Sequence, residues 1–229
     1  MNRTVQPELL DTLPPDDPQA LGSRRDLRRV NAWMGNHALM AHALLKSFDD
    51  HPPAQITDLG AGDGHFLLRV AQEIEPRWPR VNAILVDHQR HVTPETVAAF
   101  AALGWRAEPF VGDVFSWRQT AKPGAVVIAC LFLHHFEDQR LSELLRLISQ
   151  QTSCFIALEP RRAPWPLFCS RLLWGIGCNR VTRHDAPVSV RAGFAGNELS
   201  ARWPAQTGWQ LEESRAGAFS HLFIARKTG

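Results

Sequence analysis

Short apolar runs and longer amphipathic segments alternate through the middle of the chain. Short runs bounded by turn residues predict strands, whereas apolar residues spaced three and four apart predict helices. We predict strands over residues 55–59, 81–86, 106–111, 125–131 and 154–158, with helices over residues 64–74, 93–103 and 141–151. Strands that alternate with helices indicate an α/β fold, in which a mostly parallel sheet carries helices on both faces.

The N-terminal part of the chain follows a different pattern. Residues 1–22 are rich in Pro, Asp and polar side chains, which predicts a loose arm. Residues 24–48 have helical spacing that Gly35 and Asn36 interrupt, so we predict two helices with a break between them.

The C-terminal part predicts a β-hairpin over residues 209–216 and 220–226, joined by a short turn. One antiparallel strand would then close an edge of the sheet, which would have seven strands in all. We expect an N-terminal arm and lid helices over residues 1–50, and a single α/β domain over residues 51–229.

The most informative motif follows the first predicted strand and reads Asp58-Leu59-Gly60-Ala61-Gly62-Asp63-Gly64. Glycines at alternate positions remove Cβ atoms from the turn, and free N–H groups at the following helix N-terminus would face a ligand. A dinucleotide-binding turn has the spacing G-x-G-x-x-G, and His65 occupies the place of its third glycine. The Asp58 carboxylate would repel a diphosphate and attract an ammonium or sulfonium group.

Polar residues follow the other predicted parallel strands, at the edge where open α/β sheets bind ligands. Asp87 follows the second strand, where a carboxylate can accept hydrogen bonds from both hydroxyls of a ribose. Asp113 and Val114 follow the third strand, where they can contact an adenine ring. His134 and His135 follow the fourth strand. The alternative is that both acids are ordinary strand-end or turn residues.

This order of a glycine turn, two acids and a histidine pair resembles the class I S-adenosylmethionine-dependent methyltransferases, of the bacterial small-molecule type. The resemblance covers roughly residues 52–160 and, more loosely, the C-terminal hairpin. It implies a Rossmann-like sheet of seven strands, an N-terminal helical lid and S-adenosyl-L-methionine as the cofactor. It also implies that Gly60 and Gly62 hold the methionine moiety and that Asp87 binds the ribose. The implied cofactor-binding residues are Asp58, Gly60, Ala61, Gly62, Asp87, His88, Gly112, Asp113, Val114, Leu131 and Asn36.

A base near the methyl acceptor would help if the acceptor is a phenol, because a phenol has a pKa of about 10. A histidine with a pKa of about 6.5 suits that task at neutral pH, so His134 or His135 is the candidate catalytic residue. The alternative is a structural histidine near a helix N-terminus.

An insertion at about residues 160–200 is rich in Trp and Phe, and it is the candidate cap over the acceptor. Its apolar content suggests that the acceptor is a hydrophobic or aromatic small molecule. Polar residues of the insertion could orient a hydroxyl or ketone group of that molecule. The candidate substrate residues are Trp33, Trp165, Trp174, His184, Asp185 and Arg191. Two alternatives stay open: a lid held to the body by salt bridges, and contact of residues 165–178 with a membrane surface.

Composition narrows the function further. A net charge of +2 gives no strong case for nucleic acid as a partner, and the four cysteines show no metal-ligand spacing. The absence of a secretory h-region and of a long apolar run leads us to expect a cytoplasmic protein without a transmembrane segment, either a monomer or a homodimer.

We predict an enzyme that methylates a phenol or quinol oxygen of a hydrophobic or aromatic acceptor. The alternatives are C- or N-methylation of a small molecule or protein, a non-catalytic nucleotide-binding module, and an NAD-dependent oxidoreductase. The glycine spacing and the absence of tyrosine argue against the oxidoreductase.

Overall fold

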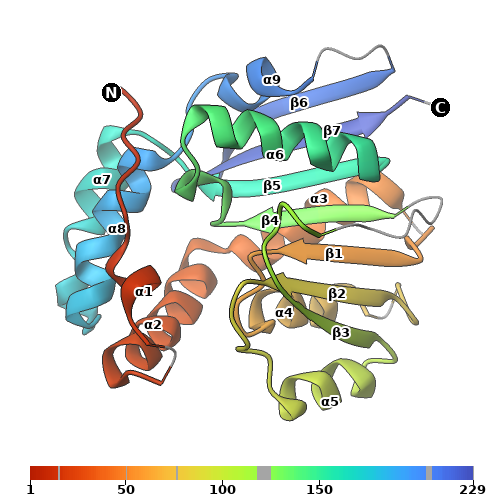
Figure 1. The fold of residues 1–229 in the computed structure, drawn as a ribbon, viewed down its shortest axis with the longest axis horizontal. Helices are drawn as coiled ribbons and strands as arrows, with labels where there is room; N and C mark the ends of the chain where they lie inside the picture. Colours follow the sequence, from red (N-terminus) through yellow and green to blue (C-terminus); the bar gives the residue numbers. More distant parts are fainter. Residues whose placement is uncertain (15, 50, 76, 118–124, 205–207, 229) are drawn as a thin grey trace.

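The computed structural model describes residues 1–229 apart from positions 15, 50, 76, 118–124, 205–207 and 229. The described part is built on a seven-stranded sheet with the strand order β3-β2-β1-β4-β5-β7-β6 (Figure 1). The strands are β1 (Gln55–Leu59), β2 (Asn82–Asp87), β3 (Arg106–Val111), β4 (Val126–Cys130), β5 (Cys154–Pro160), β6 (Trp209–Ala216) and β7 (Ser220–Lys227). The predicted α/β fold is confirmed, with small shifts at the strand ends.

Helices cover both faces of the sheet, as predicted (Figure 1). The helices are α1 (Leu9–Thr12), α2 (Pro18–Met34), α3 (Asn36–Phe48), α4 (His65–Ile74), α5 (Pro94–Ala102), α6 (Asp138–Gln151), α7 (Pro164–Ser170), α8 (Arg180–Ala192) and α9 (Glu198–Arg202), with the short 3-10 helices η1 (Leu133–His135) and η2 (Leu173–Ile176). Alternate residues of β5 divide between two cores: Ile156 and Leu158 pack with α3, α4 and α5, whereas Phe155 and Ala157 pack with α6 and α9.

The predicted break between the first two long helices is confirmed at Gly35. This residue has φ 70°, in the left-handed region, and its N–H donates to the carbonyls of Asn31 and Ala32. The helix α6 begins at Asp138, earlier than predicted, because its first turn is polar and shows no apolar periodicity.

The C-terminal hairpin is also confirmed. Strand β7 pairs antiparallel with β5, from Cys154 opposite Arg226 to Pro160 opposite Ser220, and β6 then pairs antiparallel with β7. The hairpin therefore extends the sheet beyond β5.

Helices α1, α2, α7 and α8 form a helical cap beside the carboxyl ends of the central strands, at the left of Figure 1. The expected loose arm over residues 1–22 is wrong, because its polar groups bind partners far along the chain. The Thr4 N–H donates to the Arg191 carbonyl, and the N–H groups of Leu9 and Leu10 donate to the Asp185 carboxylate. Of the helices described, none is both long enough and apolar enough to cross a bilayer.

Candidate cofactor and acceptor site

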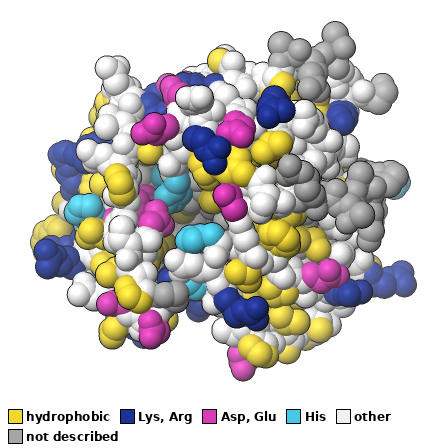
Figure 2. All heavy atoms as spheres, in the orientation of Figure 1, with side chains coloured by type: hydrophobic (Ala, Val, Ile, Leu, Met, Phe, Trp, Pro, Cys, Tyr) yellow, Lys and Arg dark blue, Asp and Glu magenta, His cyan; other side chains and the backbone are white. Residues whose placement is uncertain are grey.

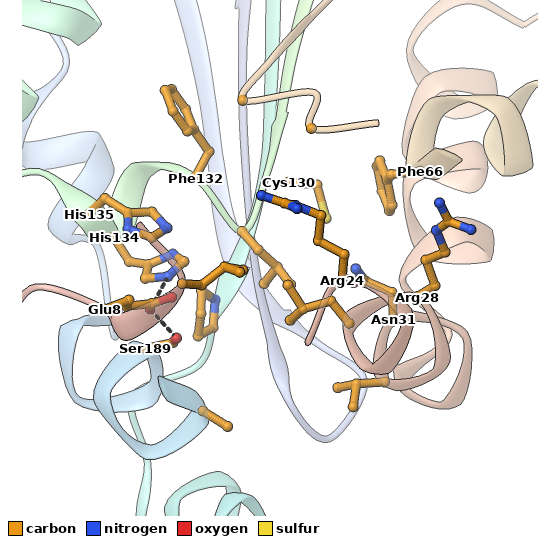
Figure 3. A pocket seen from close by; sticks show the side chains of 18 of the residues that line it. Glu8, Arg24, Arg28, Asn31, Phe66, Cys130, Phe132, His134, His135 and Ser189 are labelled. Carbon is orange, nitrogen blue, oxygen red and sulfur yellow. Dashed lines mark hydrogen bonds and ion pairs between the residues drawn. The ribbon is translucent and has the colours of Figure 1, made fainter. Parts of the chain in front are cut away.

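A cavity of about 570 Å³ lies between the helical cap and the carboxyl ends of β1, β2 and β4 (Figure 3). One wall comes from the glycine turn and from the residues that follow β2. A second wall comes from the end of β4 and the segment that follows it, within residues 130–136, and the third is formed by residues of α1, α2, α7 and α8. Several of these side chains point into the cavity from opposite sides, among them Arg24 of α2 and Cys130 of β4 (Figure 3).

Glycine is required at the turn after β1 because Gly60, Gly62 and Gly64 have φ values of 71°, 57° and 76°. Their surroundings differ, however. A Cβ on Gly60 would lie 2.3 Å from the Phe132 ring, and one on Gly64 would lie 2.9 Å from the Leu85 side chain, whereas a Cβ on Gly62 would meet nothing within 4 Å. The open face of the turn is therefore at Gly62.

The expectation that this turn offers several free N–H groups is wrong. The N–H groups of Gly60 and Ala61 donate to the Val86 carbonyl, and that of Gly62 donates to the Asp87 carboxylate at 2.9 Å. These bonds hold the turn against the end of β2. A phosphate would have to compete with them, which weakens the case for a dinucleotide further.

Asp58 lies at the end of β1, behind the turn, and is buried. Burial, together with the nearby charge of Asp87, raises the pKa of Asp58 to about 8. Its Oδ2 atom has no hydrogen-bond partner among the described residues. An unpartnered buried carboxylate of this kind is satisfied best by a cationic group brought next to it.

Asp87 lines the cavity at the end of β2, and His88 lines it beside Asp87. One Asp87 oxygen accepts from the Gly62 N–H and the other accepts from the Gln89 N–H, both at 2.9 Å. These bonds fix the carboxylate at the cavity wall, where each oxygen keeps capacity to accept a further hydrogen bond.

Five of the expected cofactor residues are not among the described residues that line the cavity: Asp58, which lies buried behind the turn, and Asn36, Gly112, Asp113 and Val114. The Asp113 carboxylate is exposed and accepts from the Phe115 N–H. Asn36 is fully buried, donates to Asn31 Oδ1 and accepts from the Ser220 hydroxyl. It joins the α2–α3 junction to the hairpin.

His134 lines the cavity but is 3% exposed and lies between two carboxylates. Its Nδ1 is 2.8 Å from Glu159, and its Nε2 is 3.4 Å from Glu8 (Figure 3). Burial lowers the pKa of His134, but the hydrogen bonds and charges of Glu159 and Glu8 outweigh it and raise the pKa to about 9. A ring that is protonated at neutral pH cannot accept a proton, so His134 does not fit the expected role of base.

His135 lies next to His134 on the cavity wall, with the ring centroids 4.3 Å apart. Its side chain is 27% exposed, and its Nδ1 is 3.2 Å from the carboxylate of Asp11 in α1. A carboxylate that binds one ring nitrogen leaves the other available to accept a proton. Of the two histidines, His135 therefore keeps the geometry of a base.

Only Trp33, of the six candidate substrate residues, is among the described residues that line the cavity. Trp165 and Trp174 are 58% and 64% exposed and are not among the described residues that line the cavity. The Asp185 carboxylate accepts from the Leu9 and Leu10 N–H groups and from the His184 ring, so it fixes α1 to α8. The Arg191 carbonyl accepts from Thr4. At these positions hydrogen bonds hold the first residues of the chain to α8, and the substrate role of these residues stays a prediction.

Sequence reasoning missed several lining residues of the cap, above all Glu8, Asp11, Arg24, Arg28 and Asn31. Four arginines lie between positions 24 and 29, and one of them, Arg28, pairs with Asp63 of the glycine turn. The charge pattern of α2 could not reveal this, because Asp63 belongs to a different element.

Glu8, His134 and His135 bring one carboxylate oxygen and two ring nitrogens within 4.8 Å of one another. Such donors could hold a divalent cation only after His134 loses its proton. The raised pKa of His134 opposes that loss, so the group is better described as a buried ion pair beside a histidine.

No protein-family model matches the chain. A phenazine O-methyltransferase, PhzM of Lysobacter antibioticus, is 34% identical over 117 residues, which is 50% of this chain. The chain spans only 32% of the length of that relative.

Solved structures match over most of the chain. The plantazolicin methyltransferase BpumL, in complex with SAH and a desmethyl analogue of plantazolicin, has a TM-score of 0.69 at 12% identity and covers 93% of this chain and 92% of its own. The mitomycin 7-O-methyltransferase MmcR has a TM-score of 0.59 at 20% identity over 96% of this chain and 60% of its own. With the glycine turn and the strand order described above, these likenesses show that the chain has the fold of the class I S-adenosylmethionine-dependent methyltransferases.

Proposed function

We propose that the chain transfers a methyl group from S-adenosylmethionine to an oxygen of a hydrophobic or aromatic small molecule, such as a phenol or quinol. The observation that carries the proposal is the position of Gly62 and Asp87 on one wall of a largely apolar cavity, with His135 on another. The cavity thus has a polar wall suited to a cofactor and an apolar space suited to an acceptor.

The residues of the first wall fit the cofactor. The open face at Gly62 admits backbone contact with the methionine moiety, because no side chain lies within 4 Å of a Cβ built there. The buried Asp58 carboxyl, whose Oδ2 has no partner among the described residues, suits the ammonium group, and Asp87 on the cavity wall can accept from ribose hydroxyls. S-adenosylmethionine, when bound, supplies a sulfonium-activated methyl group.

The apolar part of the cavity fits an apolar acceptor. It is lined by aromatic and aliphatic side chains, namely Leu27, Val30, Trp33, Met34, Phe66, Phe132, Phe136, Leu173 and Phe219. These side chains exclude water and hold a planar molecule in place, and methyl transfer depends mainly on such alignment.

We assign the role of general base to His135. Its Nδ1 is held by Asp11 at 3.2 Å, which orients the ring, and its Nε2 can take the proton of an acceptor hydroxyl. His134 supports it as a fixed, charged neighbour, because Glu8 and Glu159 hold both of its ring nitrogens.

The activities of two similar proteins favour oxygen as the methylated atom, since PhzM is a phenazine O-methyltransferase and MmcR a mitomycin 7-O-methyltransferase. Methylation of carbon or nitrogen would use the same cofactor wall. Methylation of nitrogen would differ in its need for a base, because a neutral amine is already nucleophilic.

Calorimetric titration with S-adenosylhomocysteine tests the cofactor, with NAD as the negative control. We expect binding of S-adenosylhomocysteine, no response to NAD, and affinity at least tenfold weaker in Asp87→Ala, which is about 1.4 kcal/mol. Glu143→Gln, an exposed carboxylate change on α6, is the matched control and should bind normally. Tight binding of NAD instead would overturn the proposal.

A panel of hydroxylated aromatic acceptors, with production of S-adenosylhomocysteine as the readout, tests the reaction itself. Mass spectrometry of the product then locates the methyl group. Methylation of an amine or of a ring carbon in preference to every phenol and quinol of the panel would contradict the O-methylation assignment.

A further inference from the structure

Large apolar side chains of the segment from α7 to η2 point into solvent. Their exposed fractions are 58% for Trp165, 53% for Phe168, 45% for Leu172, 64% for Trp174 and 49% for Ile176. We call these five residues the α7–η2 face. Their clustering on one short segment is unusual, because apolar side chains exposed on a monomer are normally scattered.

The same segment has a second, inward side. Pro166, Ser170 and Leu173 are buried and line the cavity, and Cys169 lines it as well. One side of the segment therefore borders the candidate acceptor site while the α7–η2 face stays open, so inward packing does not explain the outer residues.

The charges on the segment that carries the α7–η2 face are of one sign. No Asp or Glu occurs between Glu159 and Asp185, whereas Arg161, Arg171 and Arg180 do. Arg171 is exposed within the face itself. Basic and hydrophobic side chains also lie together along the edge of the molecule where α7 and α8 run (Figure 2).

Helix α2 extends this surface. Arg29 donates to the carbonyl of Ile176, which places the C-terminal half of α2 against η2. Arg25, Arg29 and Trp33 follow one another at four-residue spacing, so they form one exposed row, in which Trp33 is 62% exposed. Arg29 also pairs with the buried Asp26.

We propose that the α7–η2 face docks on the surface of an anionic lipid bilayer. Tryptophan is enriched at membrane–water interfaces, and arginine beside an apolar face adds attraction to anionic headgroups. Pairing with a second copy of the chain through the same face is less favourable, because it would set like-charged arginines against one another. The docking is peripheral, since no described helix could cross a bilayer.

Docking there would set the cavity beside the lipid. Cys169 and Leu173 lie on the segment that carries the face, and they line the cavity on their inner side. A hydrophobic acceptor dissolved in the bilayer could then enter without crossing water. This second step rests on the proposed methyl transfer, whereas the docking itself does not.

Co-sedimentation with vesicles tests the docking, with phosphatidylcholine alone compared with phosphatidylcholine that contains phosphatidylglycerol. We expect partitioning into the anionic vesicles only, reduced at least tenfold in the double variant Trp165→Ser and Trp174→Ser. Two matched pairs of variants separate loss of the α7–η2 face from the general effect of a new negative charge. One pair compares Leu172→Glu with Leu211→Glu on β6, and the other compares Arg171→Glu with Arg146→Glu on α6. Only the first member of each pair should lose binding.

Circular dichroism and binding of S-adenosylhomocysteine, measured in the same variants, show whether they are folded and carry the cofactor site. Equal sedimentation of all variants, or no sedimentation of the parent protein, would overturn the docking. Dimerisation that both Leu172→Glu and the Trp double variant abolish, without vesicle binding, would instead make the face a contact between copies. Failure to bind S-adenosylhomocysteine would affect only the proposed function.

Discussion

The carboxylate of Glu8 lies 3.4 Å from Nε2 of His134, and this ion pair joins the first residues of the chain to the segment after β4. Neighbouring bonds fix the pair in place. The Ser189 hydroxyl of α8 donates to Glu8, and Glu159 of β5 holds the other ring nitrogen of His134. The cavity wall is therefore assembled from four parts of the sequence.

Glu8→Gln should lower the free energy of unfolding by about 1.5–3 kcal/mol, the usual value of a hydrogen bond to a charged group. Burial raises the pKa of Glu8, but the His134 hydrogen bond and charge outweigh it and lower the pKa to about 2. The contribution of the Glu8 carboxylate to stability is therefore complete above pH 4.5, its ordinary pKa, and is lost as pH falls toward 2. The contribution of His134 is complete below pH 6.5 and is lost as pH rises through about 9.

Urea unfolding at a series of pH values measures this effect. The difference between the parent protein and Glu8→Gln should be largest between pH 4.5 and 6.5 and should shrink on both sides. Glu143→Gln is the control for a surface carboxylate. A difference that stays constant from pH 5 to 10 would show that Glu8 and His134 do not form a charged pair.

Binding of S-adenosylhomocysteine at pH 7 should release a proton from Asp58. Burial and the charge of Asp87 raise the pKa of Asp58 to about 8, so its carboxyl is mostly protonated before the ligand ammonium arrives. Calorimetry in buffers with different ionisation enthalpies counts the released proton, and Asp58→Asn should abolish the release. Buffer-independent heats in the parent protein would contradict the assignment.

The same carboxyl has an effect on stability. The pKa of Asp58 is raised from its ordinary value of 3.8 to about 8 in the folded protein. Asp58 therefore favours folding below pH 3.8 and loses that contribution to stability as pH rises through about 8. Without ligand, Asp58→Asn should therefore be more stable than the parent protein above pH 8, which thermal unfolding can measure.

His135→Gln should lower kcat by about 10²–10⁴-fold, the usual contribution of a general base, while the affinity for S-adenosylhomocysteine is kept. Asp11→Asn should have a smaller effect, because it only orients the ring. His134→Gln should mainly lower stability. Rates at a saturating phenol concentration check this order, and equal losses in His134→Gln and His135→Gln would argue that the pair acts only structurally.

Gly60→Ala and Gly62→Ala should separate stability from binding. Both introduce a Cβ at positive φ, a strain of about 1–2 kcal/mol. Gly60→Ala also pushes against the Phe132 ring at 2.3 Å and should lose more stability, whereas the Cβ of Gly62→Ala enters open space. We expect Gly62→Ala to weaken binding of S-adenosylhomocysteine at least tenfold with a smaller loss in Tm. Calorimetry and thermal unfolding measure the two effects.

Much of the fold could be predicted because its signals are local. The apolar runs of β4 and β5, the Thr93 cap of α5 and the glycine break at Gly35 each depend on neighbours in the sequence. The arm could not be predicted in this way. Arg3 is polar, yet it donates to the carbonyls of Phe136 and Ala192, which only the folded chain brings near it.

The residues of the site also divide into those that the local sequence predicts and those that only the folded chain brings together. The glycine turn and Asp87 lie at strand ends, where the topology alone places a ligand, and both line the cavity. Helical periodicity marks Trp165 and Trp174 as apolar but does not say which side of the segment faces inward. In the structure these two side chains face out, while Pro166 and Leu173 face the cavity.

The two halves of the cavity come from separate stretches of the chain. The turn after β1 and the end of β2 build the half proposed for the cofactor, whereas α1, α2, α7 and α8 build most of the other. Under the proposed function, mutations in the helices should therefore reshape the choice of acceptor and leave methyl-donor recognition intact. Exchange of these helices between related enzymes offers a route to new acceptor ranges, through evolution or in the laboratory.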